Sequence, residues 1–401
     1  MSRRLGAALL GLLLATALTS PTQASVTVRE AWNFAADGSM VLKGHGFGHG
    51  HGMSQYGAQG AARKGLTERQ ILAFYYPGTK VARFTANLAV LISADTTDDL
   101  QVGWQSGLTA TDRGTGTAYK LPALTGVKRW RFAVANGRTV TQFLRGGAWR
   151  NFRLGGRVAL AGDGQFSAPS GRLSLILPGG TARTYRGVLR HARPSATSTA
   201  RDTVNVLGID AYVKGVVPAE MPASWHPEAV QAQAIAARTY ALHERAAHLK
   251  GHYQICDTVS CQVYKGMSGE HPDSNKAVDA TKGLYLTHDG QPAFTQFSAS
   301  SGGWTSAGSR PYLPSKSDPY DGWSGNGVHN WRITINKATV QRRYPDLGVI
   351  RGLTVKRREG GGDWGGRVES LLIRGSKANR TISGNDARFL FGLRSTWFTK
   401  G

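Results

Sequence analysis

The segment from Pro227 to Gly251 constrains the fold more than any other part of this 401-residue chain. It opens with proline, a favoured first residue of a helix, and Glu228 follows where the helix dipole favours an acid. Alanine and other small or apolar residues then nearly encircle the predicted helix. A helix of this kind is buried on most sides, so other elements must surround it. Gln233 and Arg238 lie inside it, and each therefore needs a buried partner, a neighbouring backbone group or a cleft.

Residues 84–194 have a different character from the helical segment. Apolar and polar residues alternate there, as in Trp130–Val134 and Leu173–Leu177, and pairs of glycines interrupt the runs. This pattern is typical of short strands joined by tight turns. We therefore predict an α+β protein with a β-rich middle domain or insertion at 84–194 and a mixed α+β domain at 195–401.

Residues 25–83 form a further segment, in which two short predicted strands lead into glycines that alternate with His45, His49 and His51. Ser54 is placed to cap a first short helix, and Thr67 with Gln70 forms a capping box for a second. Three histidines suggest a metal site, but the interleaved glycines prevent a helix that would bring ligands onto one face. We expect instead that the glycines allow close backbone approach and that His49 contacts a loop or a substrate.

The first 24 residues read as a secretory signal peptide. Arg3 and Arg4 precede an uncharged apolar run, and small residues follow it near Ala24. A membrane anchor is the alternative, but the run is shorter than the roughly 20 residues that a spanning helix needs. We expect a secreted protein that resides in the cell wall or outside the cell.

The composition is strongly basic, with 49 Lys and Arg against 25 Asp and Glu, a formal charge of +24. Removal of residues 1–24 would delete two arginines and no acid, which leaves +22. Outside the cell such a charge favours anionic wall polymers as partners over nucleic acid. The basic residues are scattered, which is also typical of a solvated surface without a specific ligand.

Glu220 is the most informative carboxylate of the chain. Pro218, Met221 and Pro222 surround it in the sequence. Partial desolvation by such neighbours raises the pKa of a glutamate toward the range of a general acid. The alternative is a glutamate that only accepts backbone hydrogen bonds. Asp210, ten residues earlier, is expected to cap a short apolar helix.

Several segments together resemble the stage II sporulation protein D (SpoIID/LytB) family. They are Tyr212–Pro222, Ala232–Ala241, Cys261–Gly266, Ser300–Gly303 and Leu393–Phe398. The resemblance covers about residues 185–400 and 43–80, and it leaves the β-rich middle unmatched. In the family, the segment similar to residues 48–58 follows the one similar to Leu393–Phe398, whereas here it comes first. A circular permutation accounts for this order if the two segments pack together, which predicts that 393–398 lies beside 40–47 and that the glycine-histidine loop enters the neighbourhood of Glu220.

The resemblance implies a lytic transglycosylase that acts on peptidoglycan, with Glu220 as the catalytic residue and no cofactor. Such an enzyme cleaves the bond between N-acetylmuramic acid (MurNAc) and N-acetylglucosamine (GlcNAc) and leaves 1,6-anhydroMurNAc ends. Other family members are described as enhancers of wall amidases, so a non-catalytic protein that binds the wall and recruits or stimulates an amidase is the alternative. A hydrolase would usually need a second acid, for which Asp318 and Asp321 are candidates, although a solvated turn is the simpler interpretation of that pair.

The remaining candidate residues line the cleft or bind metal. We expect Gln233, Arg238, Ser301 and Tyr264 to join His49 in binding substrate, and tryptophans 225, 304 and 323 are candidates for stacking on sugar rings. Cys256 and Cys261 are the only cysteines, and in an exported protein they predict a disulfide. Zinc is the alternative there, with His252 as a third ligand, because some members of the family bind zinc near this place.

Overall fold

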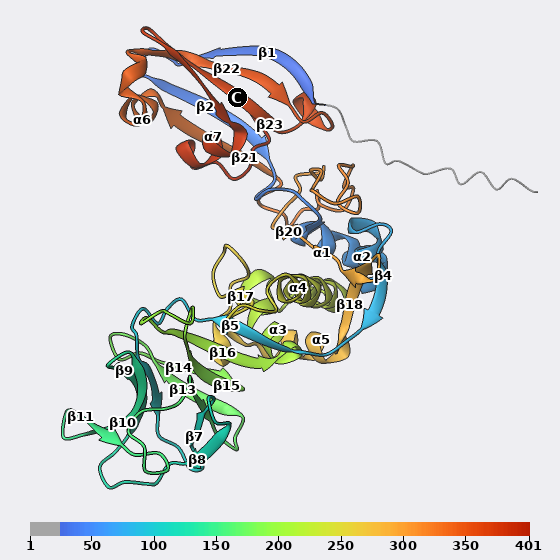
Figure 1. The fold of residues 1–401 in the computed structure, drawn as a ribbon. Helices are drawn as coiled ribbons and strands as arrows, with labels where there is room; N and C mark the ends of the chain where they lie inside the picture. Colours follow the sequence, from blue (N-terminus) through green and yellow to red (C-terminus); the bar gives the residue numbers. More distant parts are fainter. Residues whose placement is uncertain (1–24) are drawn as a thin grey trace, which may run out of the picture.

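Helix α4, Pro227–Ala247, lies in the middle of the molecule and other helices pack around it (Figure 1). The structure is a computed structural model that describes residues 25–401, so the predicted signal peptide falls outside the described residues. The helix ends four residues before the predicted Gly251. Four helices of this central unit contact α4. They are α1 Gln55–Arg63, α2 Glu68–Tyr75, α3 Ile209–Glu220 and α5 Pro272–Ala280.

The caps of α1 and α2 are those that the sequence predicts. The side chain of Ser54 accepts a hydrogen bond from Gly57 N at the start of α1. Thr67 and Gln70 form the capping box of α2. Short strands complete the central unit: β3 Met53–Ser54 pairs with β20 Phe297–Ser298, and β18 Leu284–His288 lies between β4 Lys80–Arg83 and β19 Gln291–Pro292.

Two sheets make up the β-rich unit. The first has the order β11-β10-β9-β6-β13-β14 and the second β17-β5-β16-β15-β12-β7-β8. The strands are β5 Asn87–Leu91, β6 Leu100–Gly103, β7 Thr109–Asp112, β8 Thr117–Lys120, β9 Arg129–Ala135, β10 Arg138–Arg145, β11 Ala148–Phe152, β12 Gly164–Ser167, β13 Arg172–Ile176, β14 Ala182–Arg186, β15 Val188–Ala192, β16 Asp202–Gly208 and β17 Ile255–Cys256. Phe132 and Phe166 stack between the sheets with ring centroids 4.0 Å apart. The alternation in β9 is the one predicted, because Trp130 and Phe132 are buried and their neighbours are not.

The second sheet connects the β-rich unit to the central unit. β5 is the first strand of the β-rich unit along the chain, and it pairs with β16, where the chain leaves that unit. β16 continues directly into α3. Buried side chains of both units belong to one continuous core. The β-rich unit therefore shares its core with α3, the helix that ends at Glu220.

The third unit contains both ends of the described chain. It consists of the sheet β1-β22-β23-β24, the smaller sheet β21-β2-β25 and two helices. The elements are β1 Val26–Asn33, β2 Ser39–His45, β21 Asn330–Asn336, α6 Lys337–Arg343, β22 Ile350–Arg358, β23 Val368–Gly375, β24 Asn379–Ser383, α7 Gly384–Phe391 and β25 Phe398–Lys400. The 3₁₀ turns η2 Pro345–Leu347 and η3 Asp363–Gly365 also belong to this unit, whereas η1 Gly266–Gly269 contacts α3 and β14.

The predicted meeting of the two ends is confirmed. β2 pairs with β25 so that Gly44 lies opposite Phe398, and Gly48 bridges to Ser395. Helices of the central and third units combine with sheets whose strand pairs are mostly antiparallel, so the protein is α+β, as predicted. Within residues 25–401 no helix has the length and apolar character to cross a membrane.

Candidate active site

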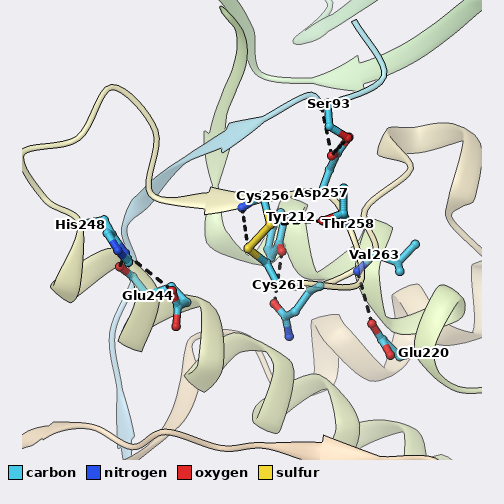
Figure 2. Close-up of a disulfide and its surroundings, with 11 residues drawn as sticks. Ser93, Tyr212, Glu220, Glu244, His248, Cys256, Asp257, Thr258, Cys261 and Val263 are labelled. Atoms are coloured by element: carbon cyan, nitrogen blue, oxygen red, sulfur yellow. Dashed lines mark hydrogen bonds and ion pairs between the residues drawn. A yellow bond between two sulfur atoms is a disulfide. The ribbon is translucent and has the colours of Figure 1, made fainter. Parts of the chain in front are cut away.

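Glu220 is the last residue of α3 and lies at a cavity of about 290 Å³. Pro218, inside the last turn of α3, and the extended backbone of Met221 end the helix there. Val263 N donates a hydrogen bond of 3.4 Å to Glu220 Oε1 (Figure 2). Burial raises the pKa of the Glu220 carboxyl above its ordinary value, and hydrogen bonds from Val263 and the Gln55 side chain oppose that shift. A carboxyl with a raised pKa can hold a proton and donate it.

Four further segments, distant from one another in the sequence, line this cavity together with Glu220 at the end of α3. They are the loop 259–263, the turn 296–297, helix α4 through Tyr240 and the glycine-histidine segment through His49. The lining residues are His49, Glu220, Tyr240, Val259, Ser260, Cys261, Gln262, Val263, Gln296 and Phe297. Glu220 is the one carboxylate among the lining residues that the structure describes. The predicted entry of the glycine-histidine loop into the neighbourhood of Glu220 is confirmed.

A disulfide between Cys256 and Cys261 shapes the loop that faces Glu220 (Figure 2). Asp257, inside the bridged loop, accepts hydrogen bonds from Ser93 Oγ and Ser93 N and so fixes the loop to the β-rich unit. Sulfurs joined in this way are not thiolates, so they do not serve as zinc ligands. His252 Nε2 donates a 2.6 Å hydrogen bond to Asp202 Oδ2. In the described part of the chain no three His, Cys, Asp or Glu side chains gather in a group suited to a metal ion.

The glycines around His49 are required by contacts of the backbone. Gly48 has φ +108 and Gly52 φ +67, a region that favours glycine. A Cβ on Gly48 would lie 2.7 Å from the Ser298 Cβ, and one on Gly52 would lie 2.1 Å from the Gln296 oxygen. Because the glycines approach the 296–298 segment so closely, His49 is carried to the rim of the cavity.

His49 is neutral in this position. Burial lowers the pKa of His49 to about 3, and the neighbouring His51 and Arg367 act in the same direction. His51 N donates a 2.9 Å hydrogen bond to Nδ1 of His49, and the two rings stack with centroids 4.9 Å apart. The proton of the neutral ring is therefore on Nε2, which makes His49 a hydrogen-bond donor at that atom.

Four of the predicted substrate-binding residues do not line the cavity, and this corrects the sequence analysis. Arg238 is 0% exposed, because its Nε donates to Asp210 Oδ1 at 2.7 Å and its Nη1 to the Leu284 carbonyl. Asp210 thus lies in the first turn of α3 as the partner of Arg238, and Gly208 is the N-cap residue. These groups fasten α3 to α4.

Tyr264, Ser301 and Gln233 are also buried away from the cavity surface. Tyr264 Oη donates to Asn205 Oδ1 at 2.8 Å, and Ser301 Oγ donates to Asp318 Oδ2 at 2.8 Å. Gln233 lies seven residues before Tyr240, on the same face of α4, and is fully buried. Neither polar atom of its side chain has a hydrogen-bond partner in residues 25–401.

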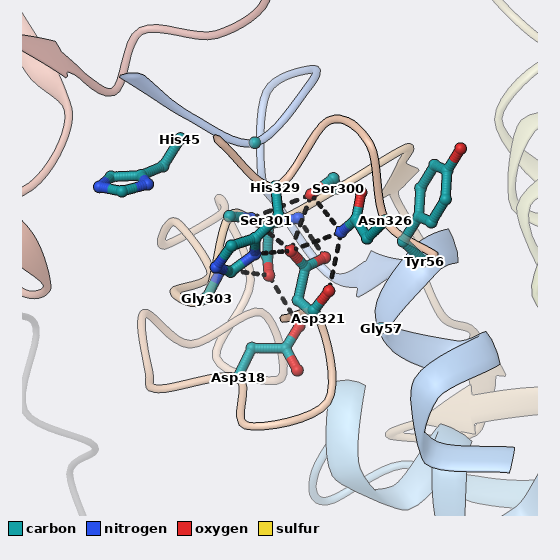
Figure 3. Close-up of polar contacts among 12 residues, drawn as sticks. His45, Tyr56, Gly57, Ser300, Ser301, Gly303, Asp318, Asp321, Asn326 and His329 are labelled. Atoms are coloured by element: carbon teal, nitrogen blue, oxygen red, sulfur yellow. Dashed lines mark hydrogen bonds and ion pairs between the residues drawn. The ribbon is translucent and has the colours of Figure 1, made fainter. Parts of the chain in front are cut away.

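Asp318 and Asp321 form a buried polar cluster, which contradicts the expected solvated turn (Figure 3). Asp321 accepts hydrogen bonds from Ser54, Ser300, Ser301 N, Gly302 N, Asn326 and His329. These bonds lower its pKa despite burial, whereas burial raises the pKa of Asp318 to about 6. The cluster joins the cap of α1 to the 300–303 turn. Neither aspartate lines the Glu220 cavity, so the geometry provides no partner acid for Glu220 from this pair.

The predicted stacking tryptophans lie outside the cavity as well. Trp225 packs edge-on against Tyr56, with ring centroids 4.9 Å apart, and Trp323 packs against both. Trp304 donates from its indole nitrogen to Ser315. The aromatic residues at the Glu220 cavity are Tyr240 and Phe297, which the sequence analysis missed because nothing in their local sequence separates them from core residues.

Comparison with known proteins bears on the segment that carries this site. Residues 197–288 match the family model described as "Stage II sporulation protein". The match identifies residues 197–288 as SpoIID-like. The matched segment includes Glu220, Tyr240 and the disulfide loop, whereas His49 and the 296–297 turn lie outside it.

Curated proteins of Bacillus subtilis are similar to this chain. The chain is 38% identical to the "Amidase enhancer" over 141 residues, which is 34% of this chain and 18% of that protein. It is 33% identical to "Stage II sporulation protein D" over 224 residues, which is 50% of this chain and 62% of that protein. A "Stage II sporulation protein D" of Bacillus amyloliquefaciens is 31% identical over 228 residues. The chain thus spans less than two thirds of the length of these relatives.

Proposed function

We propose that this protein is a lytic transglycosylase that cleaves peptidoglycan strands between MurNAc and GlcNAc. The observation that carries the proposal is the half-buried Glu220 carboxyl, with its raised pKa, at a cavity whose described lining residues include no second carboxylate. Glycosidases that hydrolyse this kind of bond usually use two acids about 5–9.5 Å apart. A single acid suffices when the substrate supplies the nucleophile.

The proposed reaction uses Glu220 twice. The protonated carboxyl donates its proton to the glycosidic oxygen, and the bond from that oxygen to C1 of MurNAc breaks with its electron pair on the oxygen. The carboxylate then takes the proton of the MurNAc 6-hydroxyl, whose oxygen forms the new bond to C1. The products are a 1,6-anhydroMurNAc end and a free GlcNAc 4-hydroxyl, and Glu220 regains its proton. The raised pKa of Glu220 supports the first step, since the acid must be protonated to act.

The surroundings of Glu220 support the positioning of a sugar. The Gln262 amide is oriented by Tyr212 Oη, which donates to Oε1, and by the Ala237 carbonyl, which accepts from Nε2. The Gln296 backbone is fixed by Tyr76 Oη and Met53 N. His49 Nε2 and the Gln296 side chain are polar groups suited to hydroxyl and acetamido substituents.

A second candidate function is stimulation of a wall amidase without glycan cleavage. The similarity to the amidase enhancer favours it, and the formal charge of +24 favours binding to anionic wall polymers. In that case Glu220 would serve the loop 259–263 through its bond to Val263. Both candidates place the protein outside the cell, in contact with the wall.

Product analysis separates the two functions. Purified protein is incubated with intact sacculi and with sacculi whose peptide stems have been removed, and the released fragments are identified by mass spectrometry. We expect anhydro-ended fragments from at least one substrate. A protein that releases none, yet accelerates stem release by an added amidase, would be an enhancer and not a transglycosylase.

A further inference from the structure

Residues 113–162 of the β-rich unit contain ten basic residues, eight of them arginines, and no Asp or Glu. The acid that precedes this stretch does not compensate them. Asp112 is buried, and its carboxylate accepts hydrogen bonds from the backbone N–H groups of Gly114, Ala161 and Gly162. Because these donors occupy the carboxylate, the positive charge of the stretch is left to other partners, to solvent or to a ligand.

A tight turn places two of these arginines on one face of a sheet edge. β11 is the edge strand, and the turn Gly146–Gly147 joins it to β10 with φ +58 and +76, a region that favours glycine. Arg150 of β11 lies opposite Phe143 of β10, and Arg145 follows Phe143 by two residues. The Arg145 guanidinium carbon is 5.5 Å from the centre of the Phe143 ring. Side chains two residues apart in a strand share a face, so Arg145 and Arg150 lie on the same side of the hairpin.

A second tight turn follows β11 and carries two more arginines. Leu154 and Arg157 exchange backbone hydrogen bonds across Gly155–Gly156, where φ is +53 and +80. Arg153 Nη1 donates a 3.1 Å hydrogen bond to the Gly156 carbonyl. A Cβ on Gly155 would lie 2.6 Å from Tyr119 Oη, so the turn packs closely against β8. Arg153 and Arg157 are therefore held at a fixed place beside the end of β11.

The four edge arginines, Arg145, Arg150, Arg153 and Arg157, form no ion pair within residues 25–401. Among the ten basic residues of the stretch, Arg131 alone forms one there, with Asp99 at 2.9 Å. All of the edge arginines except Arg145 are exposed. Figure 1 shows β11 at an end of the β-rich unit that is far from the third unit. Unpaired like charges on a rigid edge create a positive potential that attracts a polyanion.

We propose that the edge of β11 binds a phosphodiester polymer of the cell wall through the four edge arginines. The inference rests on the proposed function only for the location of the protein at the wall. A guanidinium bonds two phosphate oxygens side by side, which suits arginine to this ligand. The five residues of β11 span roughly 17 Å, so one ligand reaches the arginines at both ends only if it carries charges in series. Binding at this edge holds the central unit, and with it Glu220, close to the glycan strands.

Poly(glycerol phosphate) and two matched double variants test this site. Arg150→Gln/Arg157→Gln removes two exposed charges from the edge, and Arg342→Gln/Arg351→Gln removes two exposed charges from the third unit. We expect calorimetry at about 0.1 M salt to show about 25-fold weaker binding for the edge variant, since each cation near an anionic surface contributes about fivefold. The control variant should stay within about twofold of the wild type, because charges more than about 10 Å from the ligand are screened at this salt concentration.

Arg150→Lys/Arg157→Lys separates the effect of charge from an effect on folding. It keeps both charges and loses only the planar guanidinium, so its affinity should lie between those of the wild type and the glutamine variant. All of these variants should unfold at the wild-type midpoint, because the substituted side chains are exposed. If the double glutamine variant unfolds early, Arg157→Gln alone gives the same test, with an expected loss of about fivefold.

Three results would overturn the inference. Equal losses in the edge and control variants would show that the positive charge acts without a preferred place. Binding of polygalacturonate, a carboxylate polymer, as tightly as poly(glycerol phosphate) would exclude the proposed ligand, and equal binding of monomeric glycerol phosphate would exclude a polymer. The assay involves no cleavage, so a protein that binds the polymer at this edge but releases no anhydro ends fails the proposed function alone. A protein that cleaves strands but loses no affinity in the edge variant fails this inference alone.

Discussion

The buried cluster at Asp321 makes a quantitative prediction about Asp321→Asn. The carboxylate is 0% exposed and accepts from two backbone N–H groups, Ser301 N at Oδ1 and Gly302 N at Oδ2. An asparagine has one oxygen, so in either orientation its NH₂ group faces one of these N–H groups. A hydroxyl such as that of Ser54 or Ser300 can rotate to accept, but a backbone N–H cannot.

The magnitude follows from these bonds. The displaced N–H keeps only a longer contact to a hydroxyl oxygen, Ser54 Oγ for Ser301 N or Ser300 Oγ for Gly302 N, each at 3.2 Å. Loss of its bond to the buried carboxylate costs about 1–3 kcal/mol, and the loss of charge from the remaining hydrogen bonds costs about 1–2 kcal/mol more. We therefore expect Asp321→Asn to lower the free energy of unfolding by about 3–5 kcal/mol. At about 2–4 °C per kcal/mol, the midpoint of the affected transition should fall by about 10 °C in a thermal unfolding experiment.

Asp318→Asn is the matched control, three residues away in the same cluster. Asp318 Oδ2 accepts from the hydroxyls of Tyr75 and Ser301, and Oδ1 accepts from Tyr320 N. An asparagine oxygen can serve Tyr320 N while both hydroxyls rotate to accept, so the cost should stay below about 1 kcal/mol.

The stability of the wild type and that of Asp318→Asn should also differ in their dependence on pH. Because the pKa of Asp318 is raised to about 6 in the folded protein, the folded state holds the proton more tightly than the unfolded chain. That stabilisation is present below about pH 4 and is lost as the pH rises through about 6, so the wild type should lose stability relative to Asp318→Asn over this window. Equal midpoints for Asp321→Asn and the wild type would refute the assignment of the cluster as a structural support.

Three further predictions concern the surroundings of the proposed site. Gly50→Ala places a Cβ against Arg367 at φ +80, whereas Gly65→Ala places one at φ +87 where no atom lies within 4 Å. Gly50→Ala should therefore destabilise the protein more than Gly65→Ala. Equal denaturation midpoints for the two variants would contradict the requirement for close approach at Gly50. Arg238→Met leaves Asp210 without its ion-pair partner and should cost about 3–5 kcal/mol in urea unfolding, and an unchanged midpoint would show that this pair does not fasten α3 to α4. The value of kcat/KM for strand cleavage should fall as the pH rises through the raised pKa of Glu220, and a rate that keeps rising above neutrality would contradict its role as the acid.

Local sequence patterns predicted the elements whose causes are local. The caps at Ser54 and Thr67, the alternation in β9 and the alanine-rich helix α4 all depend on residues within a few positions of one another. The pairing of β2 with β25 was also predicted, but only through the family resemblance and the displaced glycine-histidine segment. Periodicity alone gives no information on a contact across more than 300 residues.

The errors share a physical cause. Arg238 was expected in the cleft because a polar side chain inside an apolar helix needs a partner, and Tyr264 and Ser301 were expected to bind substrate. The structure provides partners for all three inside the protein. The burial of Asp318 and Asp321 likewise depends on donors contributed by the distant Ser54 and Tyr75. A sequence shows that such a group needs a partner, but the choice between a protein group and a ligand is made by tertiary packing.

The measurement that tests the central claim most directly is the yield of 1,6-anhydroMurNAc ends from purified glycan strands with wild-type protein, Glu220→Gln and Glu244→Gln. Glu244 lies on α4 outside the cavity, beside His248 (Figure 2), and serves as the control for loss of a glutamate charge. Glutamine at position 220 keeps the volume and can still accept from Val263 N, but it can neither donate the proton nor take one. We expect Glu220→Gln to lower the rate by about 100- to 10,000-fold with wall binding retained, and Glu244→Gln to match the wild type. Anhydro ends released by Glu220→Gln at the wild-type rate would contradict the assignment of Glu220 as the catalytic acid.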